Sequence, residues 1–298
     1  MSDLIQLLVA GTALGSIYAL ICLGFVVIYR ATGVINFAQG GFVVLGGYLT
    51  HQFAAVMALP FALAVLLAVA GVAVLGLLLE RFVLRRMVGE PIFATILITL
   101  GLLYVIEQTA AAIWGYDVLP MNDPWGVSTV GVGGATLKVL DLWTIGAAAA
   151  VLVLFFAFFR RTTIGVAMRA AAIDPEAALA HGISPAVIHG LAWSIAGAVA
   201  VIAGVLLGGG ARGVDLTLTI VAFRAFPAMI LGGLESAEGA VIGGVVIGLT
   251  EVLTAAYVVP NAPWLGANFH VVMPYVVMIL VLMVRPYGLF GAVEVRRV

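Results

Sequence analysis

Cysteine, histidine and charge are scarce in this chain, and each scarcity excludes a class of protein. The single cysteine, Cys22, lies within an apolar run, so a disulfide framework is excluded. The four histidines show neither the Cys/His spacing of a zinc site nor an HExxH helix. Only 9% of the residues are charged and the basic ones are dispersed, which excludes a surface for nucleic acid.

Motifs of enzymatic chemistry are also missing from the sequence. The pattern Gly, four residues, then Gly-Lys-Ser/Thr does not occur, so the chain cannot hydrolyse ATP alone. Any energy must come from a partner or from a gradient. A membrane hydrolase needs a nucleophile and a base on facing helices, and no such pair is visible. We therefore expect no catalytic residue, no metal ligand and no cofactor in this chain.

Apolar residues are what the chain has in abundance. They make up 64% of it, glycine contributes 36 residues, and the mean hydropathy is +1.25, far outside the composition of a soluble domain. The opening "MSDLIQ" lacks the basic residues of a signal peptide. The apolar run that follows is about 26 residues long, which predicts a retained first span.

Apolar windows of about 20 residues predict an all-α integral membrane protein with eight to nine transmembrane helices. The windows are 4–29, 38–57, 61–79, 92–113, 140–159, 188–207, 218–234, 240–259 and 269–284. Glycine and polar residues interrupt the second and the seventh window, so each is expected to be a broken or a re-entrant helix. The whole chain, 1–298, is expected to be one transmembrane domain.

The placement of arginine predicts the orientation, because short loops rich in basic residues stay in the cytoplasm. These residues cluster in three segments: Arg81, Arg85 and Arg86; Arg160, Arg161 and Arg169; and Arg285, Arg296 and Arg297. The stretch 115–139 carries Asp117, Asp123 and only Lys138, as an external loop would. Nine spans with the N-terminus outside and the C-terminus in the cytoplasm satisfy these constraints together.

The two interrupted windows are similar to each other. "FAQGGFVVLGG" (37–47) and "FRAFPAMILGG" (223–233) both begin with Phe and reach Leu-Gly-Gly at the same distance. With nine spans they run in opposite directions, as in an inverted repeat whose broken helices line a transport pathway. Two alternatives stay open: a chance match in a glycine-rich chain, and glycines that serve helix packing alone.

We predict that these two segments lie close together around a central pathway. Glycines expose backbone groups there, and polar side chains either satisfy those groups or meet a polar solute. The candidate pathway residues are Asn36, Phe37, Gln39, Gly40, Phe223, Arg224, Gly232 and Gly233.

Three charged residues, Glu107, Arg224 and Glu251, lie inside apolar windows, where an ionisable group is expensive. For Glu107 we expect an internal ion pair or a side chain that extends to the interface, and for Glu251 a structural function. Arg224 adjoins the second interrupted segment. It either shapes the pathway and attracts a carboxylate-bearing solute, or forms an internal ion pair.

A short cytoplasmic helix is encoded within the polar segment 160–189. Asp174 suits the N-cap, Pro175 the first helical position, and Gly182 a left-handed cap at the C-terminal end. The predicted helix, 175–181, is rich in alanine, and an exposed face of small residues is suited to docking into the groove of a partner. The residues expected to contact that partner are Asp174, Pro175, Glu176, Ala177, Ala178 and Gly182.

Four segments occur in the order "LGFVVIYRATGVINFAQGGFVVLGGYL", "TIGVAMRAAAIDPEAA", "LGGLESAEGAVIGGVVIG" and "RPYGLFG", and "EAALAHG" (176–182) directly overlaps the second. Together they resemble permeases of the branched-chain amino acid ABC transporter class, the Liv type. "EAALAHG" resembles the Glu-Ala-Ala…Gly loop that inserts into the ATP-binding subunit. The resemblance implies a second, related permease or a second copy of this chain, two cytoplasmic ATPases that bind ATP and Mg²⁺, and an external solute-binding protein.

The resemblance is not complete. The family usually has lysine where this chain has Arg224, and Pro227 interrupts the same segment. The glycine and proline usual in the following loop are here Glu235 and residues 237–238, which leaves the solute open.

The implied function is an ABC importer permease in the inner membrane of a prokaryote, for a small and mostly apolar solute such as leucine, isoleucine or valine. Permeases for short amides, urea or aromatic acids are the alternative within the class. A gradient-driven secondary transporter fits the spans equally well. The segment 160–189 favours the importer, because a secondary transporter has no ATPase to engage.

Overall fold

Helices make up most of the structure, a computed structural model that describes residues 2–291. The first half forms α1 (Ser2–Thr32), α2 (Gln39–His51), the π-helical turn η1 (Gln52–Val56), α3 (Phe61–Phe82), the 3₁₀ turn η2 (Leu84–Met87) and α4 (Ile92–Trp114). An antiparallel hairpin of β1 (Thr129–Val132) and β2 (Ala135–Lys138) follows, with Thr129 paired to Lys138.

The second half continues with helices and helical turns. They are α5 (Val139–Arg161), α6 (Thr163–Ile173), α7 (Pro175–Ala180), α8 (Pro185–Gly208), α9 (Leu218–Arg224), α10 (Phe226–Gly232), α11 (Ala237–Leu253), η3 (Thr254–Val258), α12 (Val259–Asn261), η4 (Pro263–Leu265) and α13 (Phe269–Val284). Among the described residues, six helical segments are long and apolar enough to cross a membrane. The chain is therefore an all-α membrane protein, as predicted.

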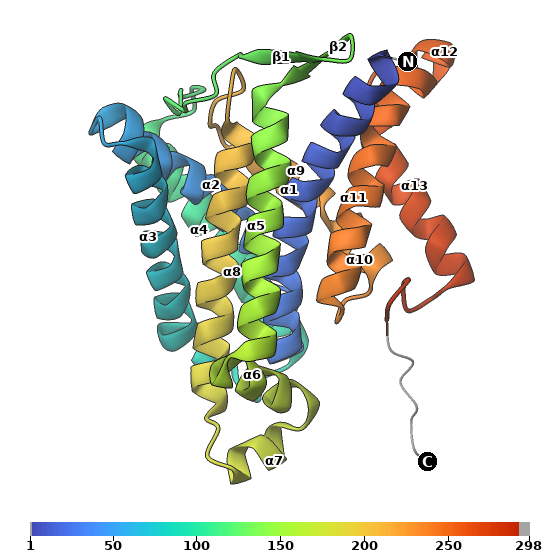
Figure 1. Cartoon of the computed structure of the whole chain (residues 1–298). Helices are drawn as coiled ribbons and strands as arrows, with labels where there is room; N and C mark the ends of the chain where they lie inside the picture. The colour runs from blue at the N-terminus through green and yellow to red at the C-terminus, as the bar shows by residue number, and fades with distance from the viewer. Residues whose placement is uncertain (1, 292–298) are drawn as a thin grey trace.

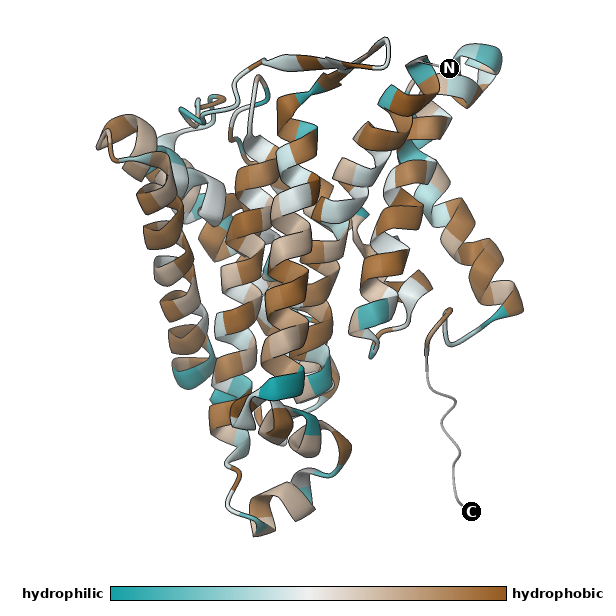
Figure 2. Cartoon of the chain, viewed as in Figure 1, coloured by the Kyte–Doolittle hydropathy of each residue, from teal (hydrophilic) through white to brown (hydrophobic). Residues whose placement is uncertain are grey.

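The long helices stand side by side in a bundle (Figure 1). The hairpin and α12 lie at one end, and α6 and α7 lie at the other. We call the second the arginine-rich end, because α5 ends there at Arg161 and α6 carries Arg169. Hydrophobic residues dominate the long helices between the two ends, as lipid contact requires (Figure 2). Arg296 and Arg297, used above to orient the chain, lie outside the described residues.

The most buried spans are α1 and α8, and each packs closely along a second helix. Where α1 meets α11, a Cβ at Gly15 would lie 2.6 Å from the Cα of Val245. Where α8 meets α3, a Cβ at Gly76 would lie 2.5 Å from the Trp193 carbonyl oxygen. Small residues thus let both helix pairs approach closely. The helix α1 runs toward the arginine-rich end and α8 runs away from it, a pair of directions that an inverted repeat requires (Figure 1). The repeat itself stays a prediction.

The predicted spans agree with the helices apart from a few residues at their ends. The window 269–284 coincides with α13. The second window is α2 continued without a gap by η1, so the break expected inside it is absent, and the non-helical residues lie before it, at 33–38. The seventh window is divided into α9 and α10 only at Ala225, a residue that keeps helical backbone angles. The predicted helix 175–181 is α7, which ends at Ala180. Neither α6 nor the hairpin was predicted.

The residue-by-residue match between 37–47 and 223–233 is wrong as a structural alignment. The helix α2 begins just after Phe37, whereas α9 begins before Phe223. The first Leu-Gly-Gly lies within α2, while the second ends α10, where Gly233 has a φ of +102°. The two segments do run in opposite directions: α2 leads to the hairpin end, and α10 leads to the arginine-rich end (Figure 1).

Candidate functional site

The first break in the helical pattern lies between α1 and α2, at residues 33–38. Asn36 is fully buried there, and its Oδ1 accepts a hydrogen bond from the Ala38 N–H at 3.0 Å. The Phe37 N–H donates to Thr99 Oγ1 of α4 at 3.2 Å. Gln39, also fully buried, donates from Nε2 to the Ala196 carbonyl of α8 at 3.2 Å. These bonds hold the non-helical backbone between α4 and α8, which is how irregular backbone is tolerated at membrane depth.

The second break lies at Ala225, between α9 and α10, and aromatic rings join it to the first. The Phe37 ring stacks on Phe226 with centroids 5.7 Å apart, and it lies 6.1 Å from the Phe223 ring. At the break itself, the Cys22 thiol of α1 donates to the Ala225 carbonyl at 3.0 Å. The two interrupted segments therefore lie close together, as predicted, and the central pathway around them stays a prediction.

Buried polar atoms without partners gather around the two breaks. Asn36 Nδ2, Gln39 Oε1, Thr219 Oγ1 and Arg224 Nε make no hydrogen bond among the described residues. A Cβ at Gly40 would lie 3.0 Å from the Thr219 methyl carbon, so α2 and α9 touch here. An unpaired buried donor or acceptor costs about 1–3 kcal/mol. These atoms are therefore suited to meet water or a polar solute.

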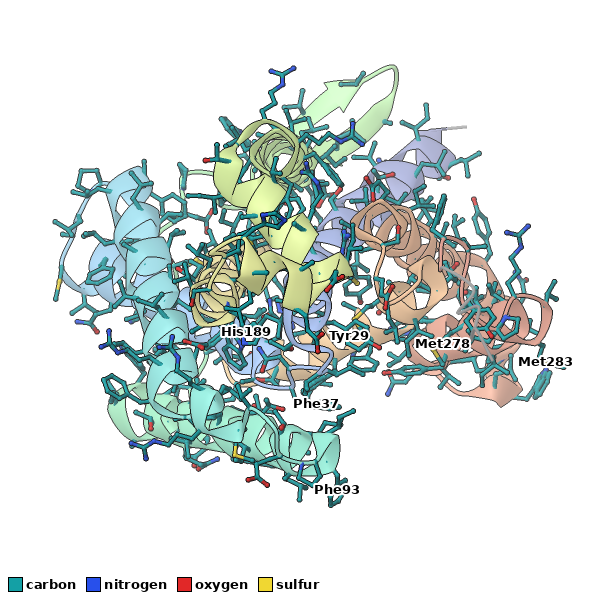
Figure 3. All side chains as sticks on the ribbon, turned by 90° about the horizontal axis from the view of Figure 1, so that it is seen from below. Tyr29, Phe37, Phe93, His189, Met278 and Met283 are labelled. Atoms are coloured by element: carbon teal, nitrogen blue, oxygen red, sulfur yellow. The ribbon has the colours of Figure 1, made fainter. Side chains whose placement is uncertain are left out.

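Phe37, at the first break, lies toward one side of the bundle (Figure 3). Seen from the arginine-rich end, Phe37 and Tyr29 lie between Phe93 of α4 and Met278 and Met283 of α13 (Figure 3). Phe93 is 70% exposed and Met283 is 78% exposed, so large apolar side chains border this side. Such a side is suited to contact either lipid or another membrane subunit.

Arg224 belongs to a buried ion-pair network that joins three helices. Its Nη1 donates to Glu251 Oε1 of α11 at 3.0 Å, and Tyr18 of α1 donates from its hydroxyl to Glu251 Oε2 at 2.6 Å. The Glu251 side chain is 6% exposed and the Arg224 side chain 25%. Both carboxylate oxygens of Glu251 are paired, which supports the structural function expected for it, and that function stays a prediction. For Arg224, the internal pair is present, and the Nε nitrogen still lacks a partner.

Glu107 and Arg212 do not belong to this ion-pair network. Glu107 is half-buried and forms no ion pair within residues 2–291, so the expected internal ion pair is absent there, and the side chain that extends to the interface stays a prediction. Arg212 lies in the loop between α8 and α9. Burial lowers the pKa of its guanidinium, and the opposite effect of the neighbouring Asp215 is smaller.

A cavity of about 180 Å³ leads from the first break toward the arginine-rich end. Asn36, Thr99 and His189 supply polar groups to its wall, and Trp193 supplies an aromatic one. Glu80 of α3 is buried in the wall of the cavity and is paired with Arg85 at 2.7 Å, and Arg85 also donates to the Ala186 carbonyl at 3.2 Å. The ion pair joins α3 to η2, and the second hydrogen bond joins η2 to the start of α8.

Gly232 and Gly233 lie apart from the aromatic rings, at the end of α10. A Cβ at Gly233 would lie 2.7 Å from the Gly291 nitrogen. The Phe290 N–H donates to the Gly232 carbonyl at 3.2 Å. The sequence grouped these two glycines with the pathway because they share a motif with α2. Their contacts indicate instead a packing function where α10 turns into α11.

The helix α7 has the two caps that the sequence predicted. Asp174 Oδ1 accepts a hydrogen bond from the Ala177 N–H at 2.9 Å. At the other end, Gly182 has a φ of +82°, its N–H donates to the Leu179 carbonyl at 2.9 Å, and the Ile183 N–H donates to the Ala178 carbonyl at 3.0 Å. This pair of bonds is a Schellman motif, which fixes where the helix ends.

The exposed alanine face that we expected on α7 is only partly present. Glu176 and Ala177 are exposed, but Ala178 is 5% exposed because that side of the helix packs back on the protein. The exposed surface is more apolar than expected, since Ile173 is 83% exposed and Leu179 is 58% exposed. A partner that docks here meets these larger side chains as well as Ala177.

Sequence reasoning missed several residues of the site. Tyr18 escaped notice because nothing local marks a tyrosine that will meet a glutamate far along the chain. Thr99 and Thr219 look like ordinary helix residues, yet one holds the first break and the other presents an unpartnered hydroxyl. The available signal was weak: a hydroxyl residue within an apolar span.

The fold is that of a polytopic α-helical membrane protein with interrupted helices of the kind that transporters use, and the described residues hold no Cys/His/Asp/Glu cluster suited to a metal. Comparison with known families makes the assignment specific. Residues 7–282 match the family described as "Branched-chain amino acid transport system / permease component". The chain belongs to this family, the Liv-type permeases of ABC transporters, which are transport subunits and not themselves enzymes.

Relatives resemble the chain over nearly its full length. The high-affinity branched-chain amino acid transport system permease protein LivH of Salmonella typhimurium is 30% identical, with 99% of this chain and 97% of the relative covered. BraD of Pseudomonas aeruginosa is 28% identical, with 99% and 98% covered. A chain of PsaBC from Streptococcus pneumoniae, solved in complex with Fab, covers 94% of this chain and 90% of its own at 14% identity and a TM-score of 0.46, a distant likeness.

Proposed function

We propose that the chain is the membrane permease of an ABC importer that moves a small, mostly apolar solute into the cytoplasm, with branched-chain amino acids as the first candidates. ATP hydrolysis in two cytoplasmic partner subunits drives the transport, and those partners bind the ATP and Mg²⁺. The relatives LivH and BraD, which are named for branched-chain amino acid transport, support the solute class.

One observation carries the proposal beyond family membership: α7 is capped at both ends and projects from the arginine-rich end (Figure 1). A six-residue helix is not stable by itself, so its caps hold it in one conformation. A rigid, exposed element can transmit the movement of a docked ATPase to α6 and α8, which flank it. Asp174, Glu176, Ala177 and Gly182 are the residues on which this coupling depends, together with Pro175 and Ala178.

The solute passes, in this proposal, along the side of the bundle where the two helix breaks lie. Asn36, Gln39 and Gly40 line the pathway at the first break. Phe37 and Phe223, whose rings lie near each other, line it between the two breaks. A second permease subunit covers the side bordered by α4 and α13, either a related chain or a second copy. The N-terminus then lies outside, where a solute-binding protein delivers the solute, in the inner membrane of a prokaryote.

Two alternatives make different predictions. A permease for short amides, urea or aromatic acids keeps the same coupling and changes only the solute. A secondary transporter has the same broken helices but draws energy from a gradient, and α7 is then an ordinary surface turn.

The test is reconstitution of the chain in liposomes with its second permease, its ATPases and its binding protein. Uptake of labelled leucine, isoleucine and valine is measured with ATP inside and with ionophores that abolish ion gradients. The proposal predicts uptake that requires ATP and survives the ionophores. Uptake that follows an ion gradient without ATP would show a secondary transporter. ATP-driven uptake of acetamide or urea, and not of leucine, would retain the class and change the solute.

A further inference from the structure

A second pocket, of about 80 Å³, lies at the arginine-rich end, where α1, α5, α6, α8 and the start of α11 meet. Three of its lining residues are arginines from three different helices: Arg30 of α1, Arg160 of α5 and Arg169 of α6. One carboxylate, that of Glu238, also lies in the lining. The pocket therefore has a net positive charge, and it has no part in the pathway described above.

The guanidinium groups in this pocket are poorly neutralised by the protein. Arg160 is paired with Glu238 at 3.5 Å, but their side chains are 72% and 55% exposed, so solvent weakens the pair. Arg169 has a buried Nη1 that makes no hydrogen bond among the described residues. Buried guanidinium nitrogens are rarely left without an acceptor. An anion with several oxygen acceptors would suit the planar donors of the arginines at this place.

The rest of the pocket is apolar and aromatic. Phe155, Phe156 and Phe159 of α5 line it together with Val27 of α1. The Phe156 ring lies under the Arg160 guanidinium at 6.0 Å. Because α5 ends here, the pocket lies where the hydrophobic part of the bundle gives way to polar residues (Figure 2). Arginines beside apolar rings at this depth can bind a lipid, with the arginines at its anionic headgroup and the rings along its acyl chain.

We propose that this pocket binds an anionic phospholipid. The lipid phosphate accepts hydrogen bonds from Arg169 and Arg160 and is attracted by Arg30, while an acyl chain lies along the phenylalanine rings. Basic pockets between membrane helices bind such headgroups for the same physical reasons. A bound lipid would tie α6, through Arg169, to α1 and α5, and so would steady the segment that leads into α7. The binding itself does not depend on the proposed transport function.

Native mass spectrometry of the purified chain, released from nanodiscs of mixed phosphatidylglycerol and phosphatidylcholine, tests the binding. The unmodified protein is expected to retain phosphatidylglycerol in preference to phosphatidylcholine. The double variant R160Q/R169Q is expected to lose about twenty-five-fold in that preference, because each basic residue near an anionic lipid contributes on the order of fivefold. The variant R169K, which keeps the charge, retains most of it. Arg86→Gln is the matched control, since Arg86 is exposed near the same end but outside the pocket.

Three results would overturn the proposal. Equal retention of both lipids by the unmodified protein would show that the pocket does not select an anionic headgroup. An equal loss in Arg86→Gln would show that only general charge at this end matters. Complete displacement of the lipid by inorganic phosphate would show an anion site without an acyl-chain slot. Because all three readouts concern lipid binding, they stand whether or not the chain imports amino acids.

Discussion

Substitutions of Gly182 test the backbone conformation of the C-terminal cap of α7 without changing its side-chain contacts. The φ of Gly182 is +82°, in the left-handed region where an L side chain is disfavoured by about 1–2 kcal/mol. A Cβ built on Gly182 meets no atom within 4 Å. A Cβ there consequently meets no neighbour, and its cost arises from the backbone conformation.

The free-energy cost of the left-handed conformation depends on which residue replaces Gly182. Asparagine tolerates the left-handed conformation better than other residues do, alanine bears the cost of about 1–2 kcal/mol, and the β-branched valine bears more. A change of 1–2 kcal/mol lowers the ratio of capped to uncapped α7 by about five- to thirtyfold. We therefore expect ATP-driven uptake to decrease in the order Gly, Asn, Ala, Val, with the valine variant at a small fraction of the unmodified rate.

Uptake in liposomes and ATPase activity of the purified complex provide the assay, and the thermal stability of the isolated chain provides the control. Gly182 is exposed and far from the helix contacts of the bundle, so the melting temperature should stay unchanged across the series. Full uptake by Gly182→Val with normal retention of the ATPase would refute the reasoning. An equal loss in all three variants would also refute it, because backbone strain predicts a graded series.

Three further predictions concern the bundle and the second cap of α7. Gly248→Leu places a side chain against the α1 backbone at Gly15 and should sharply reduce the yield of folded protein in detergent, whereas Gly146→Leu, which has open space around it, should not. Arg224→Gln alone should destabilise the chain by about 3–5 kcal/mol, because buried Glu251 loses its cationic partner and keeps only the Tyr18 hydroxyl, and R224Q/E251Q should restore much of the melting temperature. Asp174→Ala should reduce uptake through the loss of about 1 kcal/mol of capping, while Asp174→Asn should keep it.

The spans and the α7 caps were predictable because both depend on local sequence. A helix in lipid must satisfy its own backbone, so a continuous apolar window such as 269–284 fixes α13 closely. Likewise, Asp174 and Gly182 act on groups within a few residues of themselves. The hairpin was missed although a signal was present. Gly133 and Gly134, both with positive φ, separate two short runs and form a hairpin turn.

The network around Arg224 and the function of the second Leu-Gly-Gly were not predictable in the same way. Tyr18 and Glu251 meet only because α1 packs along α11, and no periodicity in the sequence specifies which faces touch. Gly233 shares its motif with Gly47, but one ends a helix and the other lies within one. A short shared sequence does not specify where its residues lie within a helix. The contacts of these glycines are set by tertiary packing.

The central claim, that α7 docks on an ATPase, is tested most directly by site-specific photocrosslinking in cells. A photoreactive amino acid replaces Leu179, which is 58% exposed on α7, and in a matched control it replaces Val127, which is 80% exposed near the hairpin at the opposite end. We predict that the probe at position 179 crosslinks to an ATP-binding subunit and that the probe at position 127 does not. No crosslink to an ATPase at position 179, in a strain where uptake is normal, would contradict the account.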